Sequence, residues 1–268
     1  MSAAECSPGR SQERSPECPV ALVTGAARRI GAAIARDLAA AGWAVAVHYA
    51  RSQADAEAVV GEIVAAGGSA AAVQADLAQE REVEGLVEQA SAALGPVRCL
   101  INNASIFERD EAMTATRESW DRHMQVNLRA PLVLAQALVR QLGEGDCGSI
   151  INILDQRVWN LTPHFTSYTV SKVGLWTLTQ TLAMALAPQV RVNAVGPGPT
   201  LRSARQSSEH FARQWGNVPL AHPVAPEEIA AAVRFLLDAP SVTGQMIAVD
   251  AGQHLGWTAA KTAATADE

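Results

Sequence analysis

The stretch VALVTGAARRIG, residues 20–31, decides the fold. Its first four residues are apolar, as in a short strand buried on both faces, and a helix-like spacing of apolar residues begins at Ile30. Between them, Gly25 permits a tight turn and Gly31 lets the helix pack closely on the strand. The first N–H groups of a helix have no partner within it, so they can bind a pyrophosphate. The stretch therefore predicts a strand, a phosphate-binding loop and a helix.

Strand-like runs of the same kind recur along the chain. We expect strands at residues 20–23, 44–47, 70–73, 97–101, 149–153, 190–195 and 246–249, each apolar enough to be covered on both faces. Segments with a helical spacing of apolar residues separate them. This alternation predicts an α/β fold, a single Rossmann-like doubly wound parallel sheet of about seven strands with helices on both faces. Ligands of such sheets bind beyond the carboxyl ends of the strands.

The composition indicates one soluble globular domain. Hydrophobic residues make up 49% of the 268 residues, charged residues 18%, and the net charge is -6. This acidity argues against nucleic acid or an anionic membrane as partner, and we find neither a membrane span nor a signal peptide. We therefore expect a cytoplasmic protein with a flexible tail at 1–18, a catalytic domain at 19–257 and a second flexible tail at 258–268.

The four cysteines give no sign of a metal centre. Cys6, Cys18, Cys99 and Cys147 show no CxxC spacing. Two of them lie in or beside predicted strands, so we expect buried thiols rather than disulfides or metal ligands.

The end of the second predicted strand indicates which dinucleotide is bound. Folds that prefer NAD place Asp or Glu there, whereas this run ends AVHYARS, with Arg51 and Ser52 and no acid. A guanidinium and a hydroxyl suit a 2′-phosphate, so we predict NADP(H) as the cofactor. The alternative is that Arg51 is a solvated charge at a helix start. After the third run, Asp76 could bind the adenine amino group or cap the next helix.

The segment YTVSK predicts proton chemistry. It places Tyr168 and Lys172 one helical turn apart on one face. The pKa of a phenol lies near 10, and a neighbouring ammonium group and an oxidised nicotinamide both favour the phenolate. Lys172 can therefore lower the pKa of Tyr168 and hold the nicotinamide ribose. A long polar stretch, 199–222, follows the sixth run and is interpreted as a mobile flap over the substrate pocket, or as a surface insertion.

These motifs, in this order, resemble the short-chain dehydrogenase/reductase family. The likeness rests on TGxxxRxG after the first strand, NNAS after the fourth, Asn127 in the next helix, YxxxK, and GPG after the sixth strand. It implies that Asn127, Tyr168 and Lys172 are catalytic. It also implies that residues 102–104, Asn-Asn-Ala, border the adenosine. The implied cofactor-binding residues are Gly25, Arg28, Arg29, Ile30, Gly31, Tyr49, Arg51, Ser52, Asp76, Leu77, Asn103, Ala104, Ser105, Tyr168, Lys172, Pro197 and Gly198. The family also implies a homotetramer formed through helices at 124–142 and 166–187.

Two departures from the commonest family pattern resemble its pteridine reductase branch, which includes bacterial dihydromonapterin reductases. Asp155 stands where a catalytic Ser is usual, and Arg29 where the phosphate loop usually has glycine. By this resemblance Arg29 reaches both the cofactor phosphates and the pterin, Phe107 stacks on the pterin ring, and Asp155 donates a proton with Tyr168. The implied substrate-binding residues are Arg29, Ser105, Phe107, Asp155 and Tyr168. Phe107 could instead belong to the core, and Asp155 could cap a turn.

The chemistry of the substrate explains why a carboxyl group would replace Ser. Reduction of a ring C=N requires a proton on a heterocyclic nitrogen, which a carboxyl group can relay. Our hypothesis is an NADPH-dependent reductase of dihydropterins such as dihydromonapterin, dihydrobiopterin or dihydrofolate, without a metal ion. One rival is a carbonyl reductase acting on a 3-oxoacyl thioester or sugar. The other is a protein that senses NADP(H) without turnover.

Overall fold

The computed structural model describes residues 18–202 and 206–256. Within them, seven parallel strands form one sheet in the order β3-β2-β1-β4-β5-β6-β7. The strands are β1 (Val20–Val23), β2 (Ala44–Tyr49), β3 (Ser69–Gln74), β4 (Val97–Asn102), β5 (Gly148–Ile153), β6 (Val190–Pro197) and β7 (Met246–Val249). Each contains a predicted run, so the predicted doubly wound sheet is confirmed. Apart from Cys18, the two predicted tails lie outside the described residues.

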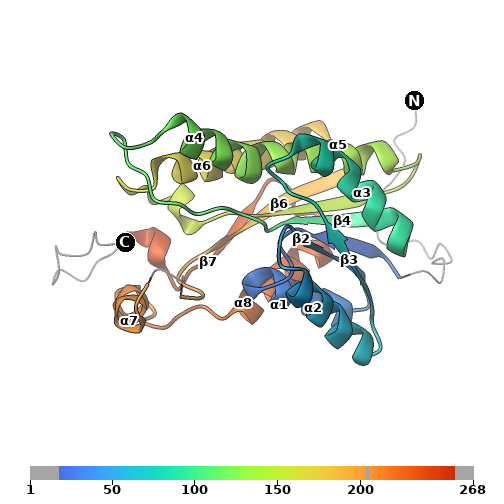
Figure 1. Cartoon of the computed structure of the whole chain (residues 1–268), viewed down its shortest axis with the longest axis horizontal. Coiled ribbons are helices and arrows are strands. Elements are labelled where there is room, and N and C mark those ends of the chain that lie inside the picture. Colours follow the sequence, from blue (N-terminus) through green and yellow to red (C-terminus); the bar gives the residue numbers. More distant parts are fainter. Residues whose placement is uncertain (1–17, 203–205, 257–268) are drawn as a thin grey trace.

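Helices cover both faces of this sheet (Figure 1). One face carries α1 (Arg29–Ala40), α2 (Gln53–Ala65) and α8 (Pro226–Asp238). The other carries α3 (Glu80–Leu94), α4 (Arg117–Met124), α5 (Ala130–Gln141) and α6 (Thr166–Ala185). A π-helical segment, η1 (Gln125–Arg129), joins α4 to α5, and the short 3₁₀ helices η2 (Gln156–Val158) and η3 (Gln253–Leu255) follow β5 and β7. The helix α7 (Ser208–Gly216) stands apart from both layers at one end of the molecule (Figure 1).

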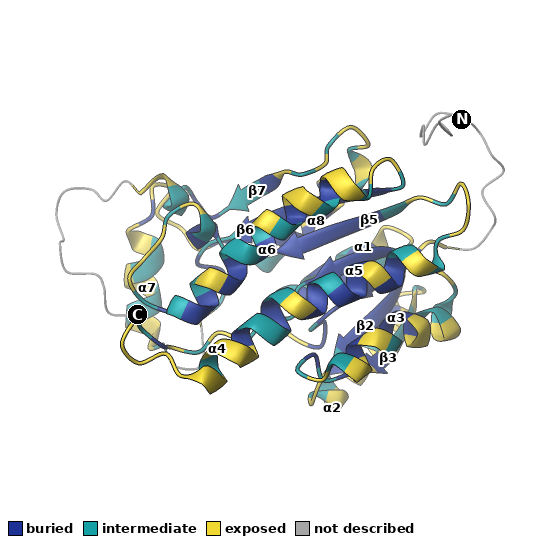
Figure 2. Cartoon of the chain, turned by 90° about the horizontal axis from the view of Figure 1, so that it is seen from above, coloured by how far each residue is buried: buried dark blue, intermediate teal, exposed yellow. Residues whose placement is uncertain are grey.

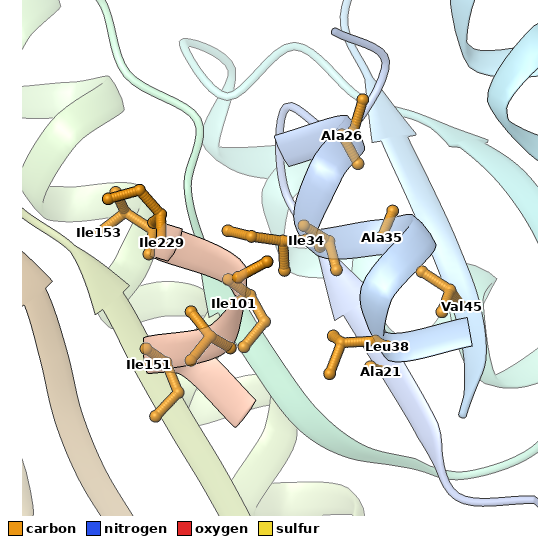
Figure 3. Packing of buried hydrophobic residues seen from close by; sticks show 14 of the residues in the cluster. Ala21, Ala26, Ile34, Ala35, Leu38, Val45, Ile101, Ile151, Ile153 and Ile229 are labelled. Carbon is orange, nitrogen blue, oxygen red and sulfur yellow. The ribbon is translucent and has the colours of Figure 1, made fainter. Parts of the chain in front are cut away.

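Two apolar clusters, one on each face of the sheet, form most of the core. Ile34 and Leu38 lie on one side of α1 because they are four residues apart, and both are fully buried. They pack with Ile229 of α8 against Ile101 and Ile151 of the central strands (Figure 3). The second cluster lies under α3 and α5. Figure 2 accordingly shows buried strands between helices whose outer sides are exposed.

The expectation that every strand is covered on both faces is wrong for β3. Of its six residues, Val73 is buried and the others are intermediate or exposed. The strand lies at the edge of the sheet and pairs with β2. Its small alanine side chains gave it the apolar pattern of a central strand.

The cysteines agree with the sequence analysis in part. Cys99 is a buried free thiol, and burial raises its pKa to about 12. Cys18 is free but exposed and Cys147 is disulfide-bonded, so the expectation of buried thiols is wrong for these two. Cys6 lies outside the described residues. In the part of the chain that the structure describes, no cluster of His, Cys, Asp or Glu could hold a metal ion, and no helix is long and apolar enough to cross a membrane.

The turn after β1 and the end of β4 approach each other closely. Thr24 Oγ1 accepts hydrogen bonds from the backbone N–H groups of Asn103 (2.9 Å) and Ala104 (3.0 Å). The strand order reverses beside β1, which is where dinucleotide folds bind their ligand. A methyl group built at Gly31 would lie 2.3 Å from the Gly25 carbonyl oxygen and 2.5 Å from Asn103 Nδ2. Only glycine fits at this position.

We predict that Gly31→Ala lowers the free energy of unfolding by about 1–3 kcal/mol, because overpacking moves backbone rather than a flexible side chain. Gly61 is the matched control, since it lies in α2 with nothing within 4 Å of an added methyl group. Gly61→Ala should raise the stability by about 0.5–1 kcal/mol through helix propensity. Urea unfolding of both variants measures the difference, and equal effects would contradict the close approach.

Candidate active site

The β1–α1 loop is held by a histidine that the sequence analysis did not single out. The Gly25 N–H donates to Nδ1 of the buried His48 at 2.9 Å, and His48 Nε2 lies 3.0 Å from the Ala75 carbonyl oxygen. Nδ1 is therefore the acceptor and Nε2 the donor. Burial lowers the pKa of His48 to about 4, so the ring is neutral and fixes the loop against the ends of β2 and β3. His48 stands within the quoted AVHYARS, but its partners are visible only in the fold.

Arg29 joins this loop to the predicted flap. It is the first residue of α1 and has a φ of +56°, a left-handed conformation that favours glycine. Its guanidinium donates to the carbonyl oxygens of Leu201 and Arg202, both at 2.9 Å. Burial lowers its pKa. No side chain caps α1, and Ile30 and Gly31 continue its first turn, so the helix start resembles an anion site.

Cationic and hydroxyl groups gather where α2 begins. Arg28 donates through Nε to Asp55 Oδ2 at 2.7 Å, which ties the phosphate loop to the first turn of α2. Arg51 is exposed and forms no ion pair within residues 18–202 and 206–256, and Ser52 at the N-cap uses its side chain for no cap. Tyr49 ends β2 beside them. These groups fit a phosphate on the adenosine ribose. The acidic residue that NAD-binding folds place at the end of this strand is absent from Tyr49 to Ser52.

The residues after β3 and β4 form the expected adenosine side. The Asp76 carboxylate accepts from the Ala78 N–H at 3.0 Å. The helix that follows has Gln79 at its N-cap, so the alternative that Asp76 is the N-cap is wrong. Leu77 is buried. Asn102 is also buried and donates to Asn152 at 2.8 Å, so its side chain lies within the sheet rather than at the cofactor edge.

A pocket of about 740 Å³ lies beyond the carboxyl ends of β5 and β6. It brings together Arg29, Phe107, Asp155, Tyr168, Pro197 and Gly198, which the sequence analysis predicted. Its other lining residues are Arg109, Gln156, Arg157, Phe165, Pro199, Thr200, Leu201, Gln206, His210, Phe211, Gln214 and Gln253. The predicted Ser105, Asn127 and Lys172 do not line the pocket.

Tyr168 and Asp155 form a hydrogen-bonded pair in this pocket. The Tyr168 hydroxyl donates to Asp155 Oδ2 at 2.9 Å, while Oδ1 accepts from the Arg157 N–H at 2.8 Å. Asp155 therefore caps the turn of η2, as the alternative interpretation predicts, and also contacts the phenol. Lys172 is buried, donates to the Ile153 carbonyl oxygen at 2.8 Å, and has its Nζ 5.9 Å from the centre of the Tyr168 ring. Burial lowers the pKa of Lys172 to about 8, and the charge of Asp155 opposes that change.

Asn127 supports the loop after β4. It lies buried in the π-helical segment η1, and such segments are frequent at functional sites. Its Oδ1 accepts from the Ile106 N–H at 2.9 Å and from the Ser105 hydroxyl at 3.2 Å. Its Nδ2 donates to the Ile106 carbonyl oxygen and to Ser171 Oγ, both at 3.0 Å. Asn127 thus links this loop to α6, the helix of Tyr168.

Two phenylalanines form an aromatic wall beside the phenol. Phe107 is 40% exposed, so the alternative that it belongs to the core is wrong. Its ring stacks on Phe165 with 4.3 Å between centroids and meets the Tyr168 ring edge-on at 4.7 Å. The Arg157 guanidinium carbon lies 5.2 Å from the Phe165 centroid. Phe165 and Arg157 were not predicted site residues, because nothing in their local sequence brings them to Phe107.

The predicted flap contains an unexpected helix, α7. Residues of the stretch 199–222, among them Leu201, His210 and Phe211, line one side of the pocket. Residues 203–205 lie outside the described residues. A role as a mobile flap stays a prediction. Beyond β7, the segment that begins at Gly252 is held through His254, whose ring lies 2.9 Å from the Asp250 carboxylate.

The sequence and the fold both match known proteins. A family model described as enoyl-(acyl carrier protein) reductase matches residues 25–254. An uncharacterized oxidoreductase of Methylorubrum extorquens is 41% identical over 88% of this chain and 98% of its own length. A 3-oxoacyl-[acyl-carrier-protein] reductase of Synechocystis is 37% identical over 87% of this chain and 96% of its own.

Among solved structures, FolM alternative dihydrofolate reductase 1 from Brucella suis, in complex with NADP, is similar at 50% identity and a TM-score of 0.87. The match covers 92% of this chain and 98% of that one. The chain belongs to the short-chain dehydrogenase/reductase family. The NADP of the Brucella protein agrees with the NADP(H) prediction. The Synechocystis relative is named a 3-oxoacyl-[acyl-carrier-protein] reductase and the Brucella protein a dihydrofolate reductase, so the names do not define the substrate of this short-chain reductase.

A buried polar cluster that the sequence analysis missed positions the helix of this reductase that carries Tyr168. The N-cap residue of α6 is Phe165 in a left-handed conformation, which offers no side-chain cap. Asp110 caps the helix from the loop after β4: its Oδ1 accepts from the Ser167 N–H at 3.0 Å and its Oδ2 from Ser119 Oγ at 2.9 Å. Ser167 Oγ also contacts Asp110 and lies 2.8 Å from His123 Nδ1. Asp110 thus fastens the loop that carries Phe107 to the start of α6, beside Phe165.

We predict that Asp110→Ala lowers the free energy of unfolding by about 2 kcal/mol or more, because it removes a helix cap and leaves buried donors unpaired. Burial raises the pKa of Asp110, but the hydrogen bonds from Ser167 and Ser119 outweigh it and hold the pKa below its ordinary value of 3.8. A depressed carboxyl pKa contributes stability above the unfolded pKa, and that contribution disappears as the pH falls through the folded value.

Urea unfolding of wild type and Asp110→Ala at pH 7, 5 and 3.5 measures this difference. The difference in free energy of unfolding should have its full size at pH 7 and 5 and should be smaller at pH 3.5. Ser119→Ala is the control, because it removes one of the bonds and keeps the carboxylate, and its loss should be smaller. A difference independent of pH would show that the charge of Asp110 is not involved.

Proposed function

We propose that this protein is an NADPH-dependent reductase of pteridines, with a dihydropterin such as dihydromonapterin, dihydrobiopterin or dihydrofolate as substrate. One observation carries the proposal: an Asp carboxylate, rather than a Ser hydroxyl, accepts the hydrogen bond of the Tyr168 phenol, in a pocket walled by Phe107. The similar Brucella protein, named as a dihydrofolate reductase, supports it.

The cofactor would lie along the carboxyl edge of the sheet. The open start of α1 and the loop at Gly25 fit the pyrophosphate, and Arg51 with Ser52 fits the 2′-phosphate. The absence of a side chain at Gly31 allows the loop to close on Asn103. Pro197 and Gly198 line the pocket where the nicotinamide would meet the substrate. NADPH supplies the hydride when it is bound.

The proton would come from the Tyr168–Asp155 pair. The buried ammonium group of Lys172 stabilises a phenolate at Tyr168 Oη, which makes that phenol a better proton donor at neutral pH. The Tyr168 hydroxyl oxygen lies 2.9 Å from Asp155 Oδ2, so Asp155 in its protonated form can give its proton to Oη or to a ring nitrogen and becomes the carboxylate. Asn127 and Ser105 orient the loop that presents Phe107 rather than exchange protons.

The substrate ring would lie against Phe107, with Arg29 at its polar side. The exposed part of Phe107 offers an aromatic surface next to the phenol, and stacking of a planar ring there contributes about 1 kcal/mol beyond burial. Arg29 lines the same pocket and belongs to the phosphate loop, so one guanidinium can contact both ligands.

Reduction of a 3-oxoacyl thioester is the second candidate. The relative from Synechocystis bears that name, and the matching family model is described as an acyl carrier protein reductase. Tyr168 and Lys172 would serve it equally well. It requires Asp155 to take the place of the Ser hydroxyl that stands at this position in the commonest family pattern. Retention of Asn127, Tyr168 and Lys172 argues against a sensor of NADP(H) without turnover.

The assembly we propose is a homotetramer formed through residues 124–142, which span η1 and α5, and residues 166–187, which contain α6. Exposed apolar side chains of α6 support this proposal, since Val170 is 43% and Met184 76% exposed. Large apolar groups of this kind are typical of surfaces that bury on association.

A panel of substrates tests the activity. With NADPH, the protein should oxidise the cofactor when given dihydrobiopterin, dihydromonapterin or dihydrofolate, and show no turnover with acetoacetyl or 2-enoyl thioesters. Absorbance of NADPH at constant enzyme concentration measures each rate. The reverse pattern would replace the proposal by the thioester reductase, and no turnover with any of them would favour the sensor.

Within the same assay, Tyr168→Phe and Asp155→Ala should each lower kcat by about 100-fold, the usual loss for a general acid. Asp155→Ser restores the common family residue and is the informative control. If it raises turnover of acetoacetyl thioester while dihydropterin turnover falls, Asp155 determines the chemistry. Unchanged dihydropterin turnover in Asp155→Ala would remove it from the mechanism.

Arg51→Ala should weaken binding of NADPH far more than that of NADH, by about tenfold or more, because it removes a charge-assisted contact to the 2′-phosphate. Fluorescence titration of both cofactors gives the two Kd values. Arg28→Ala is the matched control, since Arg28 is already paired with Asp55 and its loss should cost less. Equal losses for NADPH and NADH would restore the alternative that Arg51 is a solvated charge.

A further inference from the structure

Gln156 is a buried polar residue of the pocket that the proton chemistry does not use. It follows Asp155 directly, starts η2 and lines the pocket. Its side chain is 6% exposed, and its Oε1 is buried without a hydrogen-bond partner. Within the described residues its amide nitrogen has no hydrogen bond either. A carboxamide at the floor of a ligand pocket is thus left unpaired.

An unpaired carboxamide in this position is costly for the fold alone. More than nine in ten buried polar groups have a hydrogen-bond partner. A buried carbonyl oxygen without one loses its hydrogen bonds to water and gains no other bond in exchange. The preceding side chain, by contrast, is satisfied, since both carboxylate oxygens of Asp155 accept hydrogen bonds, from the Tyr168 hydroxyl and from the Arg157 N–H. An apolar residue of the same size would avoid this cost. The position therefore fits a group that a ligand completes.

We propose that the Gln156 carboxamide determines specificity by pairing with a ring edge that carries an N–H beside a C=O. The inference rests on the proposed function and specifies which edge of the substrate ring the pocket binds. A carboxamide presents an acceptor and a donor side by side, and the cyclic amide edge of a 2-amino-4-oxopyrimidine presents the complementary pair. The oxygens of an acyl thioester are acceptors only, so they leave Oε1 unpaired. A site built to bond a polar edge rejects ligands that lack it.

The test combines a change in the protein with a change in the ligand, using oxidised pterin as a fluorescent probe in the presence of saturating NADP⁺. In wild type, methylation at N3, which removes the N–H, should weaken pterin binding about tenfold or more. Gln156→Met should weaken pterin about tenfold and reduce the effect of N3 methylation to about threefold or less. The midpoint temperature of unfolding without ligand should stay equal or rise, which a merely structural glutamine would not show.

Gln253→Met is the matched control, because Gln253 lines the same pocket but is only partly buried. It should leave both Kd values within about twofold of wild type. Equal losses at Gln156 and Gln253, or an unchanged effect of N3 methylation in Gln156→Met, would overturn the inference while the pteridine activity stands. If wild type binds no pterin at all, the proposed function fails with it. Gln156→Leu repeats the test should the methionine variant not fold.

Discussion

The close approach of the β1–α1 turn to the end of β4 is the constraint on which the rest of the site depends. Thr24 donates to the Ile101 carbonyl oxygen and accepts from the N–H groups of Asn103 and Ala104, so one hydroxyl joins two strands. Gly31 permits the contact because a methyl group there would overlap backbone. These contacts hold the start of the loop after β4 at the carboxyl edge of the sheet. Everything further along that loop, from the Asn127 contacts to the aromatic wall, inherits its position from this junction.

The same junction separates two electrostatic environments. On the cofactor side, partly exposed arginines and the open start of α1 favour phosphate groups. On the substrate side, the buried Lys172 carries a charge that burial disfavours, as its pKa of about 8 shows, and Asp155 partly compensates it. In the mechanism that we propose, this cation acts on the phenol of Tyr168 from behind the pocket wall. The proposed chemistry therefore depends on a charge that does not line the substrate pocket.

The fold could be predicted almost completely from the sequence, and the site in part. Parallel strands buried on both faces are continuous apolar runs, so their places were visible, and the motifs after them named Arg29, Phe107, Asp155 and Tyr168, which the pocket brings together. Contacts between distant segments were not visible. Phe165 and Asp110 become meaningful only because a left-handed residue leaves α6 uncapped, and α7 is short and lies among polar residues. The apolar pattern of β3 likewise predicted a strand covered on both faces, but β3 lies at the edge of the sheet and is largely uncovered.

Relatives named for different substrates are similar to this chain over most of its length. The sheet, the phosphate loop and the Tyr168–Lys172 pair serve hydride transfer from a nicotinamide whatever the acceptor, and they make up most of the aligned length. We propose that a few side chains on η2 and on the loop after β4 recognise the acceptor. There the chain departs from a neutral hydroxyl to a carboxylate at Asp155, adds an unpaired carboxamide at Gln156, and faces both with Phe107. In the function that we propose, a planar ring with N–H and C=O groups on its edge stacks on Phe107 and pairs with Gln156, whereas an acyl thioester has no N–H for the Gln156 carbonyl oxygen.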